Sequence, residues 1–258
     1  MISVSELCFS YKDLGANNQR VINDVSFEIE KGEFVALIGS NGSGKSTLAM
    51  LLNGVYAPES GTISVDNFNI TDSEERLTAK KKIAVLFQNP SEHIVSGSVE
   101  SDIAFSLENY GIPPLEIRER VDEALSLFGL HEFSKKHPRQ LSGGEQQKIA
   151  LAGVWALNPD YIICDEVTTY LDYESRKSVL ELLKKFALDG GGVLFITQFP
   201  IESLYADRLL ILNEGNIHES GIPSELLKNE SKMNISGHTV PKQLIVDELL
   251  MNYSMGRG

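Results

Sequence analysis

The 258-residue sequence has little cysteine, no long apolar run and fewer basic than acidic side chains. Its two cysteines, Cys8 and Cys164, lie far apart in apolar surroundings and lack the spacing of metal ligands. This excludes a disulfide framework and indicates a reducing compartment. No apolar run approaches the roughly 18–20 residues that span a bilayer, and the start MISVSELCFSY has no signal-peptide pattern. We therefore expect a soluble, cytoplasmic protein.

Basic residues are the clearest deficit. Lysine and arginine total 23 against 36 aspartate and glutamate, which gives a formal net charge of −13. Such a surface argues against sequence-independent nucleic-acid binding, which depends on neutralising phosphates. It equally argues against adsorption to an anionic membrane leaflet. We expect no nucleic-acid partner and no direct lipid insertion, so any work at a membrane requires a protein partner.

The chain does contain a regular alternation of strand and helix patterns. The segments SVSELCFSY and VINDVSFEI predict half-buried antiparallel strands, and the apolar run EFVALIG predicts a strand covered on both faces. TISVDNFNI predicts a strand with a hairpin turn near Asp66-Asn67, and helical character extends from about residue 89 to 158. Strands YIIC, GVLFIT and RLLILNEG then alternate with helices SRKSVLELLKKFAL and IESLYAD. This alternation predicts a parallel, doubly wound sheet.

The strand FVALIG runs into GSNGSGKST, which matches the phosphate-loop pattern G-x-x-x-x-G-K-[ST]. Glycines let backbone N–H groups turn toward phosphate oxygens, Lys45 supplies charge near the β- and γ-phosphates, and the Ser46 hydroxyl suits Mg²⁺. The alternative is a chance Gly/Ser turn, but a strand before and a helix after favour a nucleoside triphosphate site. The predicted nucleotide-binding residues are Gly39, Ser40, Asn41, Gly42, Ser43, Gly44, Lys45, Ser46 and Thr47.

An acidic pair follows the apolar strand in YIICDE. Asp165 and Glu166 then lie at the carboxyl end of a central strand, where ligands of such sheets bind. Asp165 is placed to hold Mg²⁺ through water, and Glu166 to polarise an attacking water. Acidic pairs at strand ends are often merely solvated, but the preceding phosphate loop favours a catalytic interpretation.

A second anion-binding pattern occurs in QLSGGEQQK, residues 140–148. Ser142, Gly143 and Gly144 open a helix, and its N-terminus offers backbone donors and a hydroxyl. A plain helix N-cap is the alternative. A chain that already has a phosphate loop has no obvious need of a second one for its own nucleotide.

These motifs together resemble the ATP-binding subunit of an ABC (ATP-binding cassette) transporter, over about residues 2–225. GSNGSGKST resembles Walker A, YIICDE resembles Walker B, and LSGGE, ending at Glu145, resembles the signature. Gln88 matches the Q-loop glutamine, and Leu171-Asp172 the D-loop. The resemblance implies an α/β fold of the ABC-type P-loop NTPases: a mixed doubly wound sheet, an N-terminal antiparallel β subdomain and a helical subdomain inserted at about 89–158. It also implies that Tyr11 stacks on adenine, and that Gln88 joins Ser46 and Asp165 at Mg²⁺.

The resemblance further implies an ATPase that uses ATP and Mg²⁺ and works as a head-to-tail dimer. ATP then lies between Walker A of one subunit and the signature of the other, with residues Ser142, Gly143, Gly144 and Glu145 acting on the partner's nucleotide. The domain at 1–225 is the ATPase domain, and its helical subdomain contacts a transmembrane coupling protein. Residues 226–258 are expected to form a helical extension, with the amphipathic segment PKQLIVDELLMNY as a possible dimer contact.

Within the family, FQNPSEHIVSGSVESDIAFSLENYGIP resembles the cobalt-type and energy-coupling-factor ATPases of micronutrient importers. This implies uptake of a vitamin or metal ion, a substrate-binding membrane protein as a further partner, and a location on the cytoplasmic face of the membrane. An exporter subunit, or another importer that works as a homodimer, is the alternative. ABC machines that act on DNA or ribosomes carry long insertions or tandem cassettes, which 258 residues do not accommodate.

One position departs from the family pattern. In GGGVLFITQFP, Gln198 stands where the family has a histidine that contacts the γ-phosphate. Glutamine can donate a hydrogen bond but cannot become cationic, so the site either hydrolyses slowly or mainly holds ATP. Because Lys45 and Glu166 remain, we favour slow hydrolysis. The hypothesis that follows is an asymmetric heterodimer, in which a non-identical ATPase subunit with the histidine does most of the hydrolysis.

Overall fold

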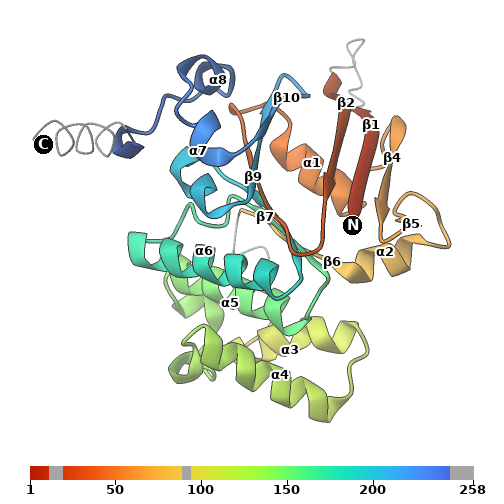
Figure 1. The fold of residues 1–258 in the computed structure, drawn as a ribbon. Helices are drawn as coiled ribbons and strands as arrows, with labels where there is room; N and C mark the ends of the chain where they lie inside the picture. Colours follow the sequence, from red (N-terminus) through yellow and green to blue (C-terminus); the bar gives the residue numbers. More distant parts are fainter. Residues whose placement is uncertain (12–19, 89–93, 245–258) are drawn as a thin grey trace, which may run out of the picture.

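The structure is a computed structural model that describes residues 1–11, 20–88 and 94–244 (Figure 1). An antiparallel sheet has the strand order β2-β1-β4-β5. Its strands are β1 (Ile2–Ser10), β2 (Arg20–Ile29), β4 (Ser60–Val65) and β5 (Phe68–Asn69). The predicted hairpin turn is confirmed, because Asp66 and Asn67 join β4 to β5 with φ values of 48° and 70°. Aspartate and asparagine tolerate this left-handed region better than most residues.

A second, central sheet has the order β10-β9-β3-β8-β7-β6. Its strands are β3 (Phe34–Ile38), β6 (Ile83–Leu86), β7 (Tyr161–Asp165), β8 (Gly192–Ile196), β9 (Arg208–Asn213) and β10 (Asn216–Gly221). Neighbours from β9 to β6 pair in parallel, as predicted, and β10 is antiparallel to β9. The strands β6 and β10 were not predicted. The half-exposed, polar sequence of β10 fits an edge strand, which has a partner on one side only.

The central sheet is buried on both faces, which explains the continuous apolar run of β3. Val35 and Leu37 pack toward the antiparallel sheet and α1 (Lys45–Leu52). Phe34, Ala36 and Ile38 pack toward the helices on the other face. Because side chains alternate along a strand, both sets must be apolar when both faces are covered.

The helices on the second face include α3 (Val99–Asn109), α4 (Pro114–Leu127), α5 (Gly143–Ala156) and α6 (Tyr173–Leu188). Figure 1 shows α3 and α4 at the end of the molecule opposite β10 and α8. The sequence of α4 carries its own start and stop signals. The helix begins at Pro114, and the chain leaves it at Gly129 with φ 65°.

Some predictions for short elements were wrong or incomplete. IESLYAD does not form an α-helix but lies in a 3-10 helix, Pro200–Tyr205, whose Glu202 and Ser203 are buried. The short helices α2 (Arg76–Lys82) and α7 (Pro223–Leu226) were not predicted, and α8 (Glu230–Ile235) lies in the segment that was expected to form a helical extension. Elements of this length depend on tertiary packing rather than on intrinsic propensity. The amphipathic segment PKQLIVDELLMNY lies outside the described residues beyond its first four, 241–244.

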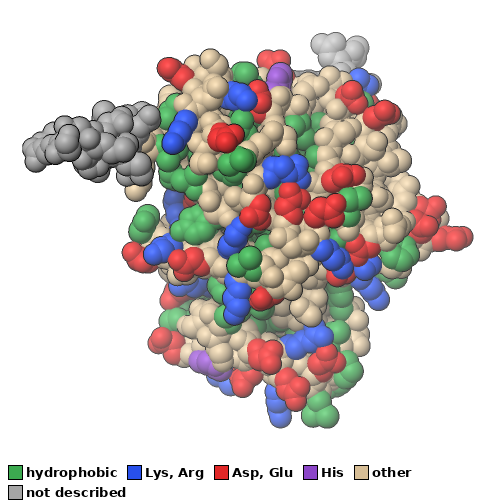
Figure 2. Space-filling view, in the orientation of Figure 1, with side chains coloured by type: hydrophobic (Ala, Val, Ile, Leu, Met, Phe, Trp, Pro, Cys, Tyr) green, Lys and Arg blue, Asp and Glu red, His purple; other side chains and the backbone are tan. Residues whose placement is uncertain are grey.

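No helix in the described ranges is long and apolar enough to cross a membrane. On the face shown in Figure 2, basic side chains are interspersed with acidic ones over the sheet region and the helical layer alike. Cys8 and Cys164 are both buried as free thiols, as their spacing predicted.

Candidate nucleotide-binding site

The central sheet brings the predicted motifs together at one edge. Leu37 of β3 pairs with Ile196 of β8, and Ile196 also pairs with Asp165 of β7. The phosphate loop follows β3, the acidic pair ends β7, and Gln198 follows β8. Because the carboxyl ends of parallel strands meet at the same edge, these motifs become neighbours despite their distance in sequence.

Two glycines of the phosphate loop are required by close backbone approaches. A Cβ on Gly39 would lie 2.1 Å from the carbonyl oxygen of Leu212. Gly44 has φ 109°, and a Cβ there would lie 2.9 Å from the carbonyl oxygen of Val21. The loop therefore packs directly on β9 and β2, which fixes its curvature around the N-terminus of α1.

The Lys45 side chain folds back over its own loop. Its Nζ donates hydrogen bonds to the carbonyl oxygens of Gly39, at 2.8 Å, and Ser40, at 3.1 Å. Burial lowers the pKa of Lys45, and the negative charges of Glu166 and Asp165 oppose this shift. The ammonium thus sits buried at the mouth of the loop, where phosphate oxygens can replace the two carbonyls.

Asp165 has the features of a cation ligand. It is 4% exposed, and its Oδ1 is buried with no hydrogen-bond partner. Burial raises the pKa of Asp165, and the negative charge of Glu166 adds to this shift. A hydrogen bond from the Ser46 hydroxyl and the positive charge of Lys45 oppose it. An orphaned carboxylate oxygen beside a hydroxyl suits Mg²⁺, which binds few protein oxygens and completes its shell with phosphates and water. Gln88 is exposed just after β6, the neighbour of β7.

Glu166 and Gln198 face each other across the strand ends. The Gln198 Nε2 donates a hydrogen bond to Oε2 of Glu166. Glu166 has φ 54° and donates its backbone N–H to the Ile196 carbonyl oxygen at 2.9 Å. A left-handed non-glycine residue of this kind is a typical feature of functional sites. Gln198 is half-buried and paired, so it is not a solvated loop residue.

A buried hydrogen-bond network centred on Glu202 connects the loops that carry this pair, and no sequence motif indicated it. Oε2 of Glu202 accepts hydrogen bonds from the hydroxyls of Thr168, at 2.9 Å, and Thr197. Arg176 lies 3.9 Å from Oε1 of Glu202, and its guanidinium lies over the Phe199 ring at 4.1 Å. Burial raises the pKa of Glu202, against the hydrogen bonds from the two threonines. The network ties the loop after β7 to the loop after β8.

Tyr11 lies at the other end of the phosphate loop. Its hydroxyl is 2.9 Å from the hydroxyl oxygen of Thr47, in the first turn of α1. Its ring packs edge-on against Phe9 and Tyr56, with centroids 5.1 Å and 5.6 Å away. Tyr11 is 41% exposed. The position beside Thr47 is consistent with the predicted adenine contact, and Tyr56 is an aromatic neighbour that the motif did not reveal.

The predicted signature segment forms a capped helix start. Ser142 caps α5 and forms a capping box with Glu145, as S-x-x-E predicts. Ser142 and Gly143 are exposed. A Cβ on Gly144 would meet the Leu171 side chain at 3.6 Å, and Asp172 caps the adjacent α6. The predicted signature and the predicted D-loop therefore lie side by side in this chain.

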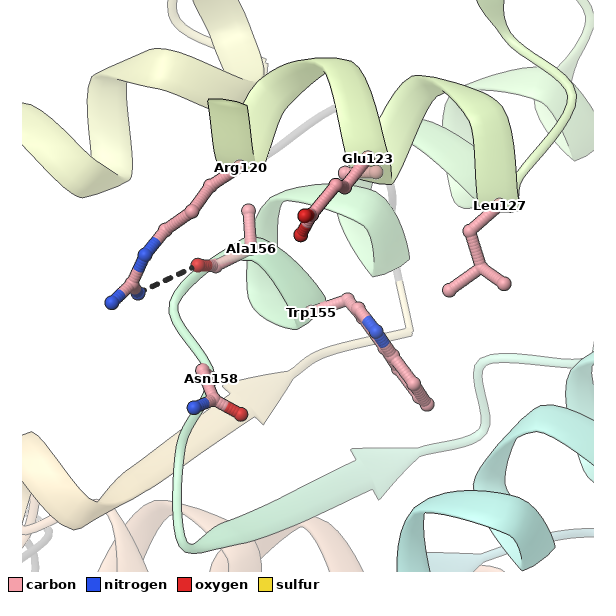
Figure 3. Close-up of a pocket in the computed structure, with 7 residues that line it drawn as sticks. Arg120, Glu123, Leu127, Trp155, Ala156 and Asn158 are labelled. Carbon is pink, nitrogen blue, oxygen red and sulfur yellow. Dashed lines mark hydrogen bonds between the residues drawn. The ribbon is translucent and has the colours of Figure 1, made fainter. Parts of the chain in front are cut away.

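A cavity of about 440 Å³ lies elsewhere, between the ends of α4 and α5 (Figure 3). Arg120 lines it and donates to the carbonyl oxygens of Ala156, at 3.1 Å, and Leu157, at 3.3 Å. Asn158, also in its lining, precedes β7 and so lies at the amino end of that strand. The cavity is thus at the sheet edge opposite Asp165 and is not part of the nucleotide site.

Comparisons with known proteins agree with this geometry. The ABC transporter family model matches residues 22–169. The energy-coupling factor transporter ATP-binding protein EcfA1 of Lacticaseibacillus paracasei is 41% identical, over 93% of this chain and 86% of that protein. The cobalt import ATP-binding protein CbiO of Syntrophus aciditrophicus is 39% identical, over 93% and 85% of the two chains.

Solved structures show the same fold. The structure of cbiO1 from Clostridium perfringens, part of the ABC transporter complex cbiONQ, matches with a TM-score of 0.79 and 32% identity, over 90% of this chain and 92% of that one. The dimeric, post-hydrolysis ATP-binding cassette MJ0796, bound to ADP and Pi, matches with a TM-score of 0.79 and 28% identity, over 86% and 99%.

Proposed function

The chain belongs to the ABC transporter family, whose ATPases couple ATP hydrolysis to transport, and we propose that it powers micronutrient uptake through a membrane-embedded partner. The observation that carries the proposal is the similarity, over 93% of the chain, to one energy-coupling-factor ATPase and one cobalt-import ATPase. The cargo is a vitamin or a metal ion. A separate substrate-binding membrane protein selects it, and this chain supplies the energy.

We assign a separate role in ATP hydrolysis to each residue at this edge of the sheet. Lys45 and the backbone of the phosphate loop bind the β- and γ-phosphates, and Tyr11 contacts the adenine. Ser46, Asp165 and Gln88 would hold Mg²⁺, which would neutralise phosphate charge. Glu166 orients a water and accepts its proton as the water oxygen attacks the γ-phosphorus. The bond from that phosphorus to the bridging oxygen breaks, and its electrons leave with ADP.

A second ATPase subunit completes the site. Ser142 and Gly143 are exposed at the N-terminus of α5, which lies beside Leu171 and the D-loop. The backbone N–H groups of a helix N-terminus suit the phosphates of a partner's nucleotide. The contact between Gln198 and Glu166 supports slow hydrolysis at this chain's own phosphate loop. We therefore favour a heterodimer with a non-identical paralogue, in which the partner's site turns over faster.

Exposed apolar side chains support a membrane-protein partner at the helical layer. Val95 and Phe105 are 59% and 40% exposed, on α3 and the segment that leads into it. Both follow Gln88 closely in sequence, so a protein docked on them can sense the nucleotide through the Q-loop. Contiguous apolar patches mark protein contacts, whereas single exposed apolar side chains are ordinary, so we propose that these two side chains belong to one such patch. Such docking places the chain at the cytoplasmic face of the membrane.

The subunit arrangement can be tested with Glu166→Gln protein. That substitution keeps ATP binding but blocks the water activation, so it traps an ATP-bound dimer if one forms. We would measure the solution mass by light scattering with Mg-ATP and without other proteins, and use the Glu166→Gln, Lys45→Ala double variant as the matched control. A monomer supports the heterodimer. A nucleotide-dependent dimer would mean that Gln198 serves both sites of a homodimer.

Transport needs an independent test. Uptake of labelled vitamins and of transition-metal ions would be compared between cells with the intact gene and cells that express the Glu166→Gln chain. The proposal predicts loss of uptake for one such nutrient. Unchanged uptake of every vitamin and metal ion tested, with impaired efflux of another compound, would instead identify an exporter.

A further inference from the structure

The end of α8 lies directly on the phosphate loop. Gly237, the first residue after the C-cap Ser236, has φ 75°. A Cβ on Gly237 would lie 2.8 Å from the Cβ of Ser40 and 3.3 Å from its Cα. Neither atom is the far end of a flexible side chain, so a side chain at position 237 would force one of the two backbone segments to move. The C-terminal part of the chain therefore touches the second residue of the nucleotide motif.

The way in which α8 ends fixes Gly237 in this position. His238 donates its backbone N–H to the Met233 carbonyl oxygen at 3.0 Å, and Gly237 donates its own to the Asn234 carbonyl oxygen at 3.1 Å. This pair of hydrogen bonds is a Schellman motif, which ends a helix on a left-handed residue, most often glycine. The conformation of Gly237 thus follows from the helix end and not from the loop that it touches.

Contacts on both sides of this glycine anchor α8 to the rest of the protein. Met233 and Ser236 are fully buried, and Val240 packs against the same core as Met233. Nζ of Lys232 lies 2.8 Å from Oε2 of Glu219 on β10. The helix end therefore cannot withdraw from the phosphate loop without losing buried contacts.

Ser40 connects this contact to the group that binds phosphate. Its carbonyl oxygen accepts hydrogen bonds from the backbone N–H of Ser43 and from Nζ of Lys45, both at 3.1 Å. A displacement of Ser40 therefore moves an acceptor that places the Lys45 ammonium. Elsewhere the loop rests on strands, with Gly39 against β9 and Gly44 against β2. At Ser40 the support comes instead from the C-terminal segment.

We propose that Gly237 is a positioning residue of the nucleotide site, whose backbone supports Ser40 so that the affinity for ATP and ADP depends on the docking of α8 against the phosphate loop. The inference rests on the proposed nucleotide site. A loop that is held in its curved form before binding loses less conformational freedom when phosphates arrive. Both nucleotides carry phosphates that the loop binds, so both depend on the contact. The linkage is reciprocal, and bound nucleotide holds α8 more firmly.

The test compares Gly237→Ala with Gly111→Ala in the full-length chain. Gly111 has a nearly equal φ of 73°, but nothing lies within 4 Å of a Cβ there, so this control carries the same backbone strain without the contact. Calorimetry would measure the dissociation constants of Mg-ADP and of a Mg-bound non-hydrolysable ATP analogue. Gly237→Ala should weaken both on the order of 10-fold, and Gly111→Ala should keep both within about 2-fold of wild type.

Ser40→Gly provides a second comparison, because it removes the Cβ that alanine at position 237 would meet. In the Ser40→Gly background, Gly237→Ala should weaken binding by about 3-fold or less, whatever Ser40→Gly costs by itself. An equal loss in both backgrounds would overturn the inference, since it would indicate general destabilisation and not this contact. Affinities of Gly237→Ala that match those of Gly111→Ala would overturn it as well.

Hydrogen exchange tests the reciprocal effect. The backbone N–H groups of Gly237 and His238 should exchange more slowly with saturating Mg-ADP in wild type, and at the same rate with and without Mg-ADP in Lys45→Ala. Unchanged exchange in wild type with ADP bound would contradict the linkage. A wild-type chain that binds neither nucleotide would overturn the proposed function as well, whereas a wild type that binds both, with Gly237→Ala unaffected, would overturn this inference alone.

Discussion

Nε2 of Gln198 donates a hydrogen bond to Oε2 of Glu166. The two residues come from the ends of β8 and β7, and the backbone N–H of Glu166 donates to the Ile196 carbonyl oxygen. The carboxylate expected to activate water is therefore already bound by an amide. Before Glu166 can accept a proton from water, this contact must open or be shared with the water, which adds a step that a histidine acting on the phosphate alone would not require.

Gln198→His should raise the turnover number of ATP hydrolysis. Loss of a single well-placed donor in such sites costs on the order of 10²–10³ in rate, and Gln198 retains one donor, so we expect a gain of roughly 10-fold. The Michaelis constant should change little. Steady-state phosphate release by the assembled dimer measures both constants. Equal turnover of the two proteins would remove the basis for the asymmetric dimer.

Lys45→Ala should abolish nucleotide binding without destabilising the nucleotide-free chain. Burial lowers the pKa of Lys45, so its charge opposes folding, and alanine removes that buried charge. Mg-ATP at 100-fold its dissociation constant adds about 2.7 kcal/mol of stability to a binding protein. Thermal unfolding with and without Mg-ATP should show this shift in wild type and in the control Lys177→Ala, at a 51% exposed lysine, but not in Lys45→Ala.

Asp66→Asn should weaken folding in a pH-dependent way. Burial alone would raise the pKa of Asp66, but hydrogen bonds from the N-terminal ammonium, Tyr161 and Lys82 outweigh it and hold that pKa well below its usual range. Because its pKa is lower in the folded than in the unfolded chain, Asp66 stabilises the fold at every pH above its unfolded pKa of about 3.9. This stabilisation is lost as pH falls through the folded pKa.

Urea unfolding of wild type and Asp66→Asn would measure this difference. Asparagine also tolerates the left-handed turn, so the comparison isolates the charge. We expect a deficit of about 1–3 kcal/mol at pH 7, which should narrow steadily below pH 4. A deficit that is constant with pH would mean that the carboxylate charge contributes nothing.

Glu202→Gln and Glu202→Ala should separate hydrogen bonding from charge. The alanine variant leaves the buried hydroxyls of Thr168 and Thr197 without their acceptor, at a cost of about 1–3 kcal/mol for each unsatisfied group. The glutamine variant keeps an acceptor. The pKa of Glu202 is raised in the folded protein. Glu202 therefore stabilises the wild-type fold at low pH, and this stabilisation is lost as pH rises through the folded pKa. Glu202→Gln should therefore gain stability relative to wild type as pH rises.

Denaturant unfolding across pH 5–8 would test this, with Glu181→Gln, at an exposed position on α6, as control. A loss of stability in Glu202→Gln as large as that in Glu202→Ala would show that the ion pair with Arg176 dominates. Turnover should fall in Glu202→Ala as well, because the network holds the turn that carries Gln198.

Several features of the site could be predicted because they are local. The strand FVALIG, the glycines and Lys45 of the phosphate loop are contiguous, and Asp165 and Glu166 follow the next apolar strand directly. The capping box of Ser142 and Glu145 spans only one helical turn. Each pattern specifies backbone geometry within a few residues, so no knowledge of the rest of the chain was needed.

Other features depend on contacts between distant segments. The strand β6 is short, and β10 is a polar edge strand, so neither has a strong pattern of its own. IESLYAD has a helical composition, yet burial of Glu202 beneath Thr168 and Thr197 accompanies a 3-10 helix instead. Nothing in the local sequence of Glu202 indicates that it connects two functional loops.

By itself, the sequence determined the kind of chemistry: a phosphate loop with its lysine, an acidic pair at a strand end, and a second helix start suited to a phosphate. Only the tertiary structure decided which of these groups touch. It placed the amide of Gln198 on Glu166 and the backbone of Gly237 on Ser40, although the residues of each pair are far apart in the sequence. Local patterns specify loops and caps through backbone geometry, whereas such pairings arise only when packing brings separate strand ends and the C-terminal segment to one edge of the sheet.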